Sequence, residues 1–463
     1  MDKIIREKCR NLLDETLNSL FLMERNFLLL ESSLFDKVES ILDRRDGFEI
    51  IGEIYSLSSA SNDGEKREII KKLENLTYKG TALTELLEFI EKNGSIIIKE
   101  KTNQNIIKEL RDNVKIFFTN NASMDLNVAN YCKNLFTLYE IFYTKLYKIN
   151  CYLYPHKFLH TCEISIKELE NLNFDRQKII ENIVENAGEE LTSGSTKLSD
   201  VCEKFQINKN LFSDINDQFD EIYYRRNILT HGEGKVSKDY EKHVSQKLKK
   251  RYIKNGKLDF PKDYENTIYE TIVLVIFKLF MATIYREETS VTNDDISFIE
   301  AIIFKVFYQT EKWNISKILY GYLRKVRFSE NCGYKEIFDV NYMCCLKALG
   351  EKDELKQHLS RFNVQNLSPI YKVAKSLISD NYTNINDQIE SIYIGINKEK
   401  SDYICAKDIM EWPLFRDYLK TDEFAKFKES HNDDFKLYDT NDQEFEDEKK
   451  FKAYIIKNIK SED

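Results

Sequence analysis

The chain has 463 residues, of which 42% are hydrophobic, enough to bury the cores of roughly two to four folded domains. It contains only 4 prolines and 14 glycines, which favours long helices over strands joined by tight turns. The formal net charge of −9 excludes nucleic-acid binding through overall charge, so any such site must be a local patch.

Cysteine usage and the apolar segments predict a cytoplasmic protein. The chain has 9 cysteines, an odd number without a Cys-x-x-Cys pair, which is typical of reduced thiols in a core. Residues Met1–Lys8 alternate charged with apolar side chains and lack the apolar run of a signal peptide. The most apolar segment, Ile268–Tyr285, contains Glu270 and Lys278 and falls short of the roughly 20 apolar residues of a membrane span.

Residues 1–117 are predicted to form an N-terminal helical region. Apolar patterns indicate helices over residues 20–30 and 34–42, and residues 58–65 have the composition of a polar loop. Ile96–Ile98 has the composition of a short strand, although no partner strand is evident. The sequence of this region points to no chemical site.

Residues 118–290 are predicted to form a compact helical bundle. Apolar side chains recur at helical spacing from Val128 to Leu146, and further helices are expected at residues 174–186 and 197–205. The last helix, at residues 264–285, is apolar nearly all round and is therefore expected at the centre of the bundle.

The helix that carries the next motif combines a permanent cation with a titratable imidazole. Its apolar positions alternate in steps of four and three residues at Ile215, Phe219, Ile222 and Leu229. Arg226 occupies the position that completes this stripe, where a guanidinium is costly unless a partner satisfies it. His231 follows five residues later, and Gly232 and Gly234 suit a helix end.

The run of Arg226, Asn227, three variable residues and His231 resembles the signature of HEPN-domain ribonucleases, in which an arginine and a polar residue precede a histidine on one helix. The resemblance implies an all-α bundle that forms a homodimer and cleaves RNA without a metal ion or other cofactor. It also implies products with 2′,3′-cyclic phosphate and 5′-hydroxyl ends.

The chemistry of these three side chains agrees with that reaction. His231 would act as general base or general acid, because an unperturbed imidazole titrates near neutral pH. Arg226 would hold the phosphate as a planar cation, and Asn227 would bind the phosphate or orient His231. At about 100° per residue, Arg226 and His231 lie about 140° apart on an ideal helix, so one helix aims them poorly at a single phosphate unless its last turn unwinds near Gly232. The resemblance implies instead a composite site that two facing protomers complete.

A basic stretch follows the motif. Residues 225–262 contain twelve Lys or Arg side chains against four acidic ones, and such a patch suits backbone phosphates. Tyr252 and Phe260 could stack on unpaired bases. The side chains predicted to contact RNA are Arg225, Lys235, Lys238, Lys249, Lys250 and Arg251. The alternative interpretation is a solvated lysine-rich loop.

Structural interpretations of the motif compete with the catalytic one. His231 could be an ordinary histidine at a helix C-terminus, which the helix dipole favours. Arg226 could be a structural arginine that is paired with an acid such as Asp220 or Glu140.

Residues 291–435 follow a pattern of helix, short turn, helix, and residues 436–463 form a charged tail. Helices are predicted at residues 294–310, 316–328, 334–349, 352–362, 369–379 and 386–393. The segment Cys345–Leu355 resembles the turn between the two helices of a tetratricopeptide-like repeat. Trp412–Phe415, followed by Phe424 and Phe427, resembles the helix that closes such an array. We expect this region to bind a protein sensor or inhibitor.

The sequence therefore predicts an all-α protein: a HEPN-like helical bundle between an N-terminal helical region and a C-terminal region of helical repeats. The expected function is that of a cytoplasmic endoribonuclease that acts as a growth-arrest toxin or in antiviral defence against phage. No metal is expected, because His156 and His160 lie four residues apart without an evident third ligand. Two alternatives stay open: a non-catalytic bundle that binds RNA or dimerises, and a helical-repeat scaffold that binds protein alone.

Overall fold

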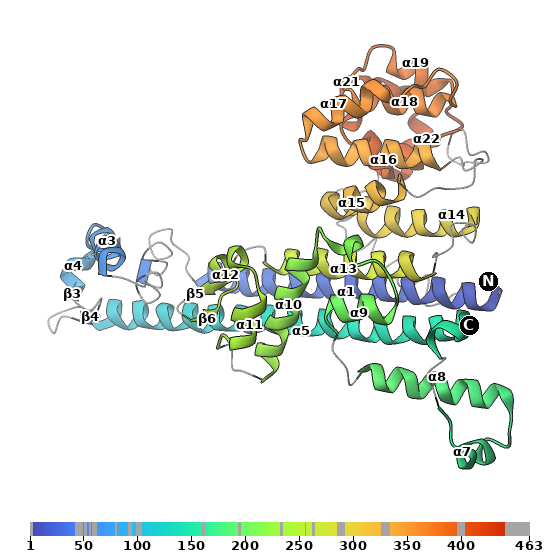
Figure 1. Ribbon diagram of the computed structural model, residues 1–463. Coiled ribbons are helices and arrows are strands. Elements are labelled where there is room, and N and C mark those ends of the chain that lie inside the picture. Colours follow the sequence, from blue (N-terminus) through green and yellow to red (C-terminus); the bar gives the residue numbers. More distant parts are fainter. Residues whose placement is uncertain are drawn as a thin grey trace. The chain divides into compact units, whose positions relative to one another are not determined.

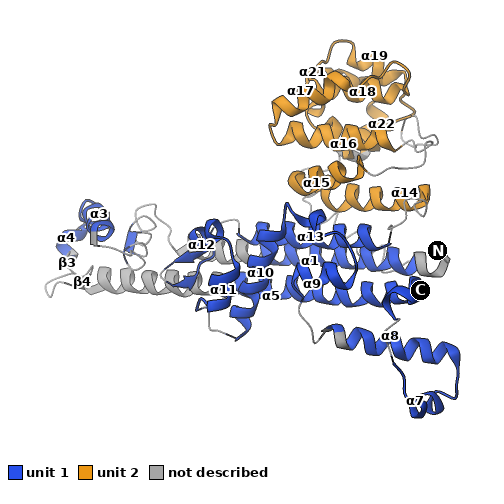
Figure 2. Ribbon diagram, viewed as in Figure 1, with its two compact units in different colours: residues 1–286 blue, residues 287–463 orange. Residues whose placement is uncertain are grey.

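The computed structural model describes residues 3–41, 50, 53–54, 57, 63–78, 81–90, 95–98, 104–159, 163–192, 196–231, 235–254, 256–261, 264–284, 292–325, 334–395 and 403–439. The prediction of an all-α protein is confirmed, because helices make up most of these residues and the described strands form only two-stranded sheets. The chain divides into two compact units, residues 1–286 and residues 287–463 (Figure 2).

The first unit consists mainly of helices, most of which are labelled in Figure 1. They are α1 (Lys3–Ile41), α3 (Asp63–Glu74), α4 (Leu83–Leu86), α5 (Gln104–Leu153), α6 (Pro155–Phe158), α7 (Ile166–Asn171), α8 (Arg176–Thr192), α9 (Leu198–Lys204), η1 (Lys209–Phe212), α10 (Asn216–His231), α11 (Lys238–His243), α12 (Gln246–Tyr252) and α13 (Tyr264–Ile284). Three antiparallel hairpins join β1 (Thr77–Tyr78) to β2 (Thr81–Ala82), β3 (Leu87–Ile90) to β4 (Ser95–Ile98), and β5 (Ile253–Lys254) to β6 (Lys257–Leu258).

The helix α5 organises this unit. It contacts α1, α8, α10 and α13, and the predicted apolar stripe between Val128 and Leu146 faces these neighbours, with Leu135 and Phe136 fully buried. The structure differs from the prediction at residues 117 and 118, because α5 runs through the expected domain boundary without a break. Thr119, Asn120 and Asn121 are weak helix formers, but they cost too little to end a long helix that packs against another.

The helix α13 lies against α1, α5 and α10. Among the described residues, α13 is the one helix that is long and apolar enough to cross a membrane. The sequence predicts no membrane-spanning segment. The most apolar window of α13 is 83% buried inside the protein, as in a core helix. Its one basic side chain, Lys278, is satisfied by both carboxylate oxygens of Asp214 at 2.6 and 2.7 Å.

The region before α5 contains a hairpin that the sequence analysis missed. Ile96–Ile98 has a partner after all, because β4 pairs with β3 in the register Leu87↔Ile98 to Ile90↔Ser95. A small hydrophobic cluster accompanies this region. Its buried members are Ile50, Leu57, Ile69, Ile70, Leu73, Leu83 and Leu87. Of the polar loop predicted at residues 58–65, residues 58–62 lie outside the described ranges, and α3 begins at Asp63.

The second unit contains the predicted succession of short helices. It comprises α14 (Asn293–Ile302), η3 (Ile303–Tyr308), α15 (Trp313–Leu323), α16 (Lys335–Ala348), α17 (Lys352–Arg361), α18 (Pro369–Ile378), α19 (Ile385–Glu390), α20 (Ala406–Glu411), η4 (Pro413–Phe415), η5 (Tyr418–Lys420), α21 (Asp422–Ser430) and α22 (Asn432–Asp439). Gly350 lies between α16 and α17 and has a φ of +73°, a left-handed conformation that glycine adopts readily. This is the turn that the sequence analysis likens to that of a tetratricopeptide-like repeat. Residues 440–463 of the predicted tail lie outside the described ranges.

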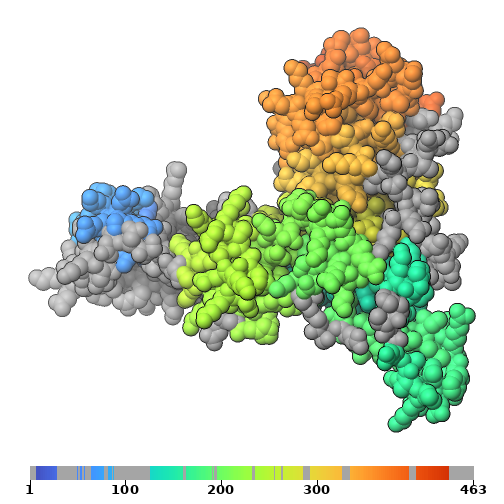
Figure 3. Space-filling view, viewed as in Figure 1, coloured from blue at the N-terminus to red at the C-terminus, as the bar shows by residue number. Residues whose placement is uncertain are grey.

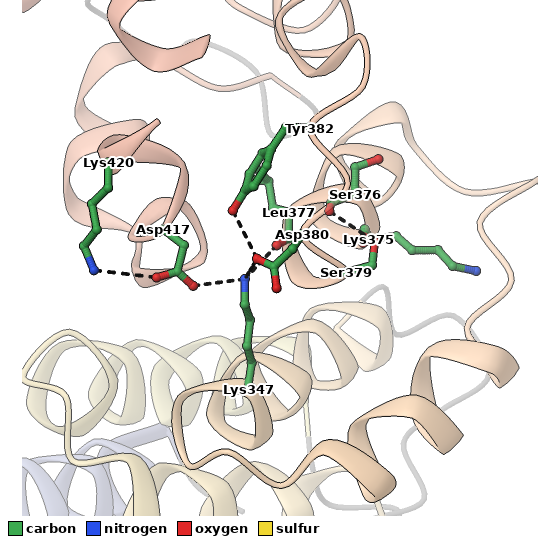
Figure 4. A network of polar contacts seen from close by, with 9 residues as sticks. All are labelled: Lys347, Lys375, Ser376, Leu377, Ser379, Asp380, Tyr382, Asp417 and Lys420. Carbon is green, nitrogen blue, oxygen red and sulfur yellow. Dashed lines mark hydrogen bonds and ion pairs between the residues drawn. The ribbon is translucent and has the colours of Figure 1, made fainter. Parts of the chain in front are cut away.

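A lysine ties three elements of the second unit together. The Lys347 ammonium on α16 donates to Asp380 at 2.6 Å and lies 3.0 Å from Asp417, as Figure 4 shows. It also donates to the Leu377 carbonyl at 2.9 Å, and the Tyr382 hydroxyl donates to Asp380 at 3.1 Å. These contacts fix α16 against the end of α18 and against the segment before η5.

A partly buried carboxyl group makes the stability of this second unit depend on pH. Burial raises the pKa of Glu300, on α14 near Tyr320, from its ordinary value of 4.5 to about 7. The folded state then holds this proton more tightly than the unfolded state. The resulting stabilisation is fully present below about pH 4.5 and is lost as the pH rises to about 7, a change of at most about 3 kcal/mol.

Replacement of Glu300 by Gln should remove this dependence. We expect Glu300→Gln to raise the urea midpoint of the second unit at pH 8 and to flatten its pH profile between pH 4.5 and 7. Tryptophan emission measures this directly, because Trp313 and Trp412 both belong to residues 287–463. The control is Glu429→Gln, which changes an exposed carboxylate on α21. Identical pH profiles for Glu300→Gln and the wild type would contradict the role of Glu300.

Candidate functional site

The motif helix α10 ends at His231, the residue at which the sequence predicts its end. His231 is exposed and lines a cleft of about 400 Å³. Asn227, one turn earlier on α10, lines the same cleft, as does His243 at the end of α11. Two of the three predicted catalytic residues therefore share one depression.

The third predicted residue, Arg226, makes its contacts with the neighbouring helix α5. Its guanidinium lies 2.5 Å from the Glu140 carboxylate and 5.1 Å from the centre of the Phe136 ring. Both partners of the ion pair are partly buried, with side-chain exposures of 23% and 27%. Glu140 is one of the two acids considered above as a structural partner. Arg226 also donates to the Asn227 side-chain oxygen at 3.1 Å, which joins the ion pair to the wall of the cleft.

The prediction that Arg225 contacts RNA is wrong. Its side chain is 0% exposed, and its Nε atom donates to the equally buried Glu221 carboxylate at 2.8 Å. Its other nitrogens donate to the backbone carbonyls of Asp259 at 2.8 Å and Tyr252 at 3.4 Å. A guanidinium with these partners cannot reach a phosphate.

The same network accounts for the aromatic residues of the basic stretch. Tyr252 is fully buried, and its ring packs on the Arg225 guanidinium together with the rings of Phe260 and Tyr264. The prediction that Tyr252 stacks on bases is therefore wrong, and Phe260 contacts Arg225 as well. Arg225 and Glu221 thus join Tyr252, Asp259 and Tyr264 to α10, and the bond from Tyr240 to Glu221 holds α11, which lines the cleft, against the same helix.

The other predicted RNA contacts lie at the surface of the first unit, in the segment drawn yellow-green in Figure 3. The exposed members are Lys235, Lys238, Lys250 and Arg251. Lys249 is partly exposed and donates to the Glu241 carbonyl. Lys235 and Lys238 lie beside the cleft residues Ser237 and Asp239 in the chain, and Lys249, Lys250 and Arg251 follow His243, so the cations flank these cleft residues in sequence.

Lys197, the residue before α9, adds a cation to the cleft. Its ammonium lies 4.9 Å from the centre of the Tyr224 ring. A hydrogen bond with the Tyr224 hydroxyl raises the pKa of Lys197, so this side chain is charged at neutral pH. Nearby, burial and then Asp217 raise the pKa of Asp220, whereas the charges of Lys197 and His243 act in the opposite direction. Among the described residues, the ionisable side chains that line the cleft, tyrosines aside, are thus Lys197, the two histidines and one acid, Asp239.

Comparison with known protein families, with curated proteins and with solved structures finds no match to this chain.

The described residues contain no group of three or more His, Cys, Asp and Glu side chains that is placed to hold a metal ion. Of the histidine pair considered above, His156 is exposed on α6, and His160 lies outside the described ranges. The seven cysteines that the structure describes are all buried in the cores of the two units.

His243 and Lys197 are among the cleft residues that were not predicted. His243 ends a helix of only six residues within the lysine-rich segment, and Lys197 precedes a short helix, so neither lies in a periodic pattern. The sequence signal that could have identified His243 is its position 12 residues after His231, within the segment that follows the motif helix.

Proposed function

We propose that this protein is a metal-independent endoribonuclease of the HEPN type. His231 would transfer a proton in the reaction, Asn227 would bind or orient the scissile phosphate, and Arg226 would stabilise its charge. The products would carry 2′,3′-cyclic phosphate and 5′-hydroxyl ends. The protein would act in the cytoplasm as a growth-arrest or antiviral defence effector.

The observation that carries the proposal is the convergence of His231 and Asn227 on one cleft at the end of α10. The cleft also receives the Lys197 ammonium, and Asn227 connects it to the Arg226 guanidinium by a hydrogen bond of 3.1 Å. An acid-base group beside cations is what phosphodiester cleavage requires when no metal ion takes part. The exposed lysines after the motif suit the phosphate backbone of RNA.

A homodimer belongs to the proposal. Within one protomer, Arg226 contacts Glu140 on α5, whereas His231 lines the cleft. The two side chains therefore do not face the same site. A second copy that faces the first would bring its Arg226 to each cleft as a further cation beside Lys197. The helical unit of residues 287–463 would bind a protein sensor or inhibitor.

Cleavage of RNA by the purified full-length protein in EDTA tests the proposal. We expect the wild type to cleave single-stranded RNA, and both Arg226→Ala and His231→Ala to lose this activity. Cleavage that survives both substitutions, or that disappears when EDTA is added, would overturn the site. If the purified wild type is restrained, expression in cells gives the same comparison, because only the wild type should arrest growth.

The second candidate function is a non-catalytic bundle that binds RNA or dimerises. The ion pair between Arg226 and Glu140 favours it, since a guanidinium with a carboxylate partner and a packed aromatic ring already has a structural role. This alternative predicts that RNA binding persists while neither the wild type nor any variant cleaves RNA. It also predicts that Arg226→Ala lowers the free energy of unfolding by more than it changes the free energy of RNA binding.

The Glu140 carboxylate should limit the affinity of the site for RNA. We expect Glu140→Gln to tighten RNA binding, because the substitution removes the negative charge that neutralises Arg226. One more cation available to phosphate should steepen the slope of log affinity against log salt concentration by about 0.7 to 0.9. Fluorescence anisotropy with a labelled single-stranded RNA at several salt concentrations measures both quantities.

A matched control for this prediction is Glu185→Gln. Like Glu140, Glu185 forms an ion pair with a basic side chain, here Lys148 of α5. Glu185 belongs to α8, and neither it nor Lys148 is next to a residue of the cleft in the sequence. Equal changes in the salt slope for both variants would mean that the effect comes from net charge alone and would contradict the specific role of Glu140.

A further inference from the structure

The ring of His243 is held in one orientation at the wall of the cleft. It stacks on Tyr224, with ring centres 4.9 Å apart and an angle of 4° between the ring planes. Its Nδ1 atom lies 2.9 Å from the carbonyl oxygen of Asp239. A carbonyl oxygen can only accept a hydrogen bond, so Nδ1 carries a proton. In the neutral imidazole the lone pair is therefore on Nε2, as a general base requires.

The cleft also contains the two other groups that the cleavage of a phosphodiester needs. His231 is exposed at the end of α10, where it can exchange protons with solvent. Lys197 supplies a fixed positive charge against the Tyr224 ring, on whose face His243 also stacks. A volume of about 400 Å³ lies within the range of pockets that hold small ligands, so one nucleotide with its phosphate is a reasonable occupant.

We propose that His243 is the general base of the RNA cleavage and that His231 is its general acid, with Lys197 facing the phosphate. This inference rests on the proposed function and adds catalytic residues to it. Nε2 of His243 takes the proton of the 2′-hydroxyl, and the 2′-oxygen forms a bond to phosphorus. The bond from phosphorus to the 5′-oxygen breaks, and His231 gives its proton to that oxygen. Exchange with water then restores both imidazoles.

Two substrates that differ only in the leaving group test these roles. One is a diribonucleotide, whose 5′-alkoxide leaves only when an acid protonates it. The other is uridine 3′-(4-nitrophenyl phosphate), whose nitrophenolate leaves without an acid. We expect His243→Ala to lower kcat/KM by about 10²- to 10⁴-fold on both substrates. His231→Ala should show a loss of this size on the dinucleotide and less than about a tenfold loss on the aryl ester.

Two further variants control for structure. His243→Asn keeps a side-chain donor toward the Asp239 carbonyl, so its activity should fall like that of His243→Ala while its circular dichroism stays that of the wild type. His156→Ala removes an exposed histidine that does not line the cleft, and it should be fully active on both substrates.

The outcomes separate this inference from the proposed function. Full activity of His243→Ala and His243→Asn beside an inactive His231→Ala would overturn the role of His243 and leave the ribonuclease intact. Recovery of His243→Ala on the aryl ester would overturn its assignment as the base. A wild type that cleaves neither substrate in EDTA, under conditions in which it binds RNA, would overturn the proposed function and this inference with it.

Discussion

Arg225→Met should destabilise the first unit by about 3–5 kcal/mol, the usual cost of removing one partner from a buried ion pair. The substitution leaves the Glu221 carboxylate buried, with hydrogen bonds only from the hydroxyls of Tyr240 at 2.7 Å and Tyr264 at 2.6 Å. It also removes the donors that hold the carbonyls of Asp259 and Tyr252. Tyr252 and Asp259 would then lose their hydrogen bonds to α10, whereas Tyr240 of α11 would keep its bond to Glu221.

Urea unfolding followed by two signals measures this loss. Far-UV circular dichroism follows the helices of both units, whereas tryptophan emission follows residues 287–463, which contain both tryptophans. We expect the circular-dichroism transition of Arg225→Met to begin at lower urea concentration, with the tryptophan transition as the reference. Arg251→Met, which changes an exposed arginine of the same segment, should stay within about 0.5 kcal/mol of the wild type. Equal stability of the two variants would contradict the structural role of Arg225.

The largest expected effect on activity belongs to His231. We expect His231→Ala to lower kcat for RNA cleavage by about 10²- to 10⁴-fold, the usual contribution of a positioned acid or base. The fold should not change, because the His231 side chain is exposed at the end of α10. RNA affinity should change little, since the exposed lysines that follow the motif remain in place.

Single-turnover cleavage together with anisotropy binding separates these quantities. Lys250→Ala is the opposite control, because the loss of an exposed cation should weaken RNA binding and leave the rate of the bound complex unchanged. A His231→Ala variant that binds RNA more weakly but cleaves at the wild-type rate would show that His231 is a binding residue.

Local patterns predicted most of the helices. In the second unit α16, α17 and α18 begin and end within one residue of the predicted ranges, because apolar periodicity and the turns at Gly350 and Pro369 are local signals. The hairpin of β3 and β4 and the length of α5 depend instead on pairing between distant segments. A reading of one sequence window contains no information about such partners.

The two arginines of the motif illustrate the same limit. Periodicity placed Arg226 in the apolar stripe of α10 and Arg225 outside it, but Arg225 is the fully buried residue. The helix α10 is covered on more than one side, by α5 and also by α11 and α13, and a single stripe reveals only one of these faces. The positions of Arg226, Asn227 and His231 on one helix could be predicted, and Glu140 was one of two acids considered as the partner of Arg226. The place of His243 in the same cleft could not be predicted.

The chemistry of the RNA ends tests the central claim most directly. A 5′-labelled single-stranded RNA would be incubated with the full-length protein in EDTA, and the products would be treated with polynucleotide kinase with and without its 3′-phosphatase activity. We predict 2′,3′-cyclic phosphate and 5′-hydroxyl ends with the wild type, and at least about a hundredfold less product with His231→Ala. Products with a 3′-hydroxyl end, or ends of the same kind and amount with His231→Ala, would contradict the account.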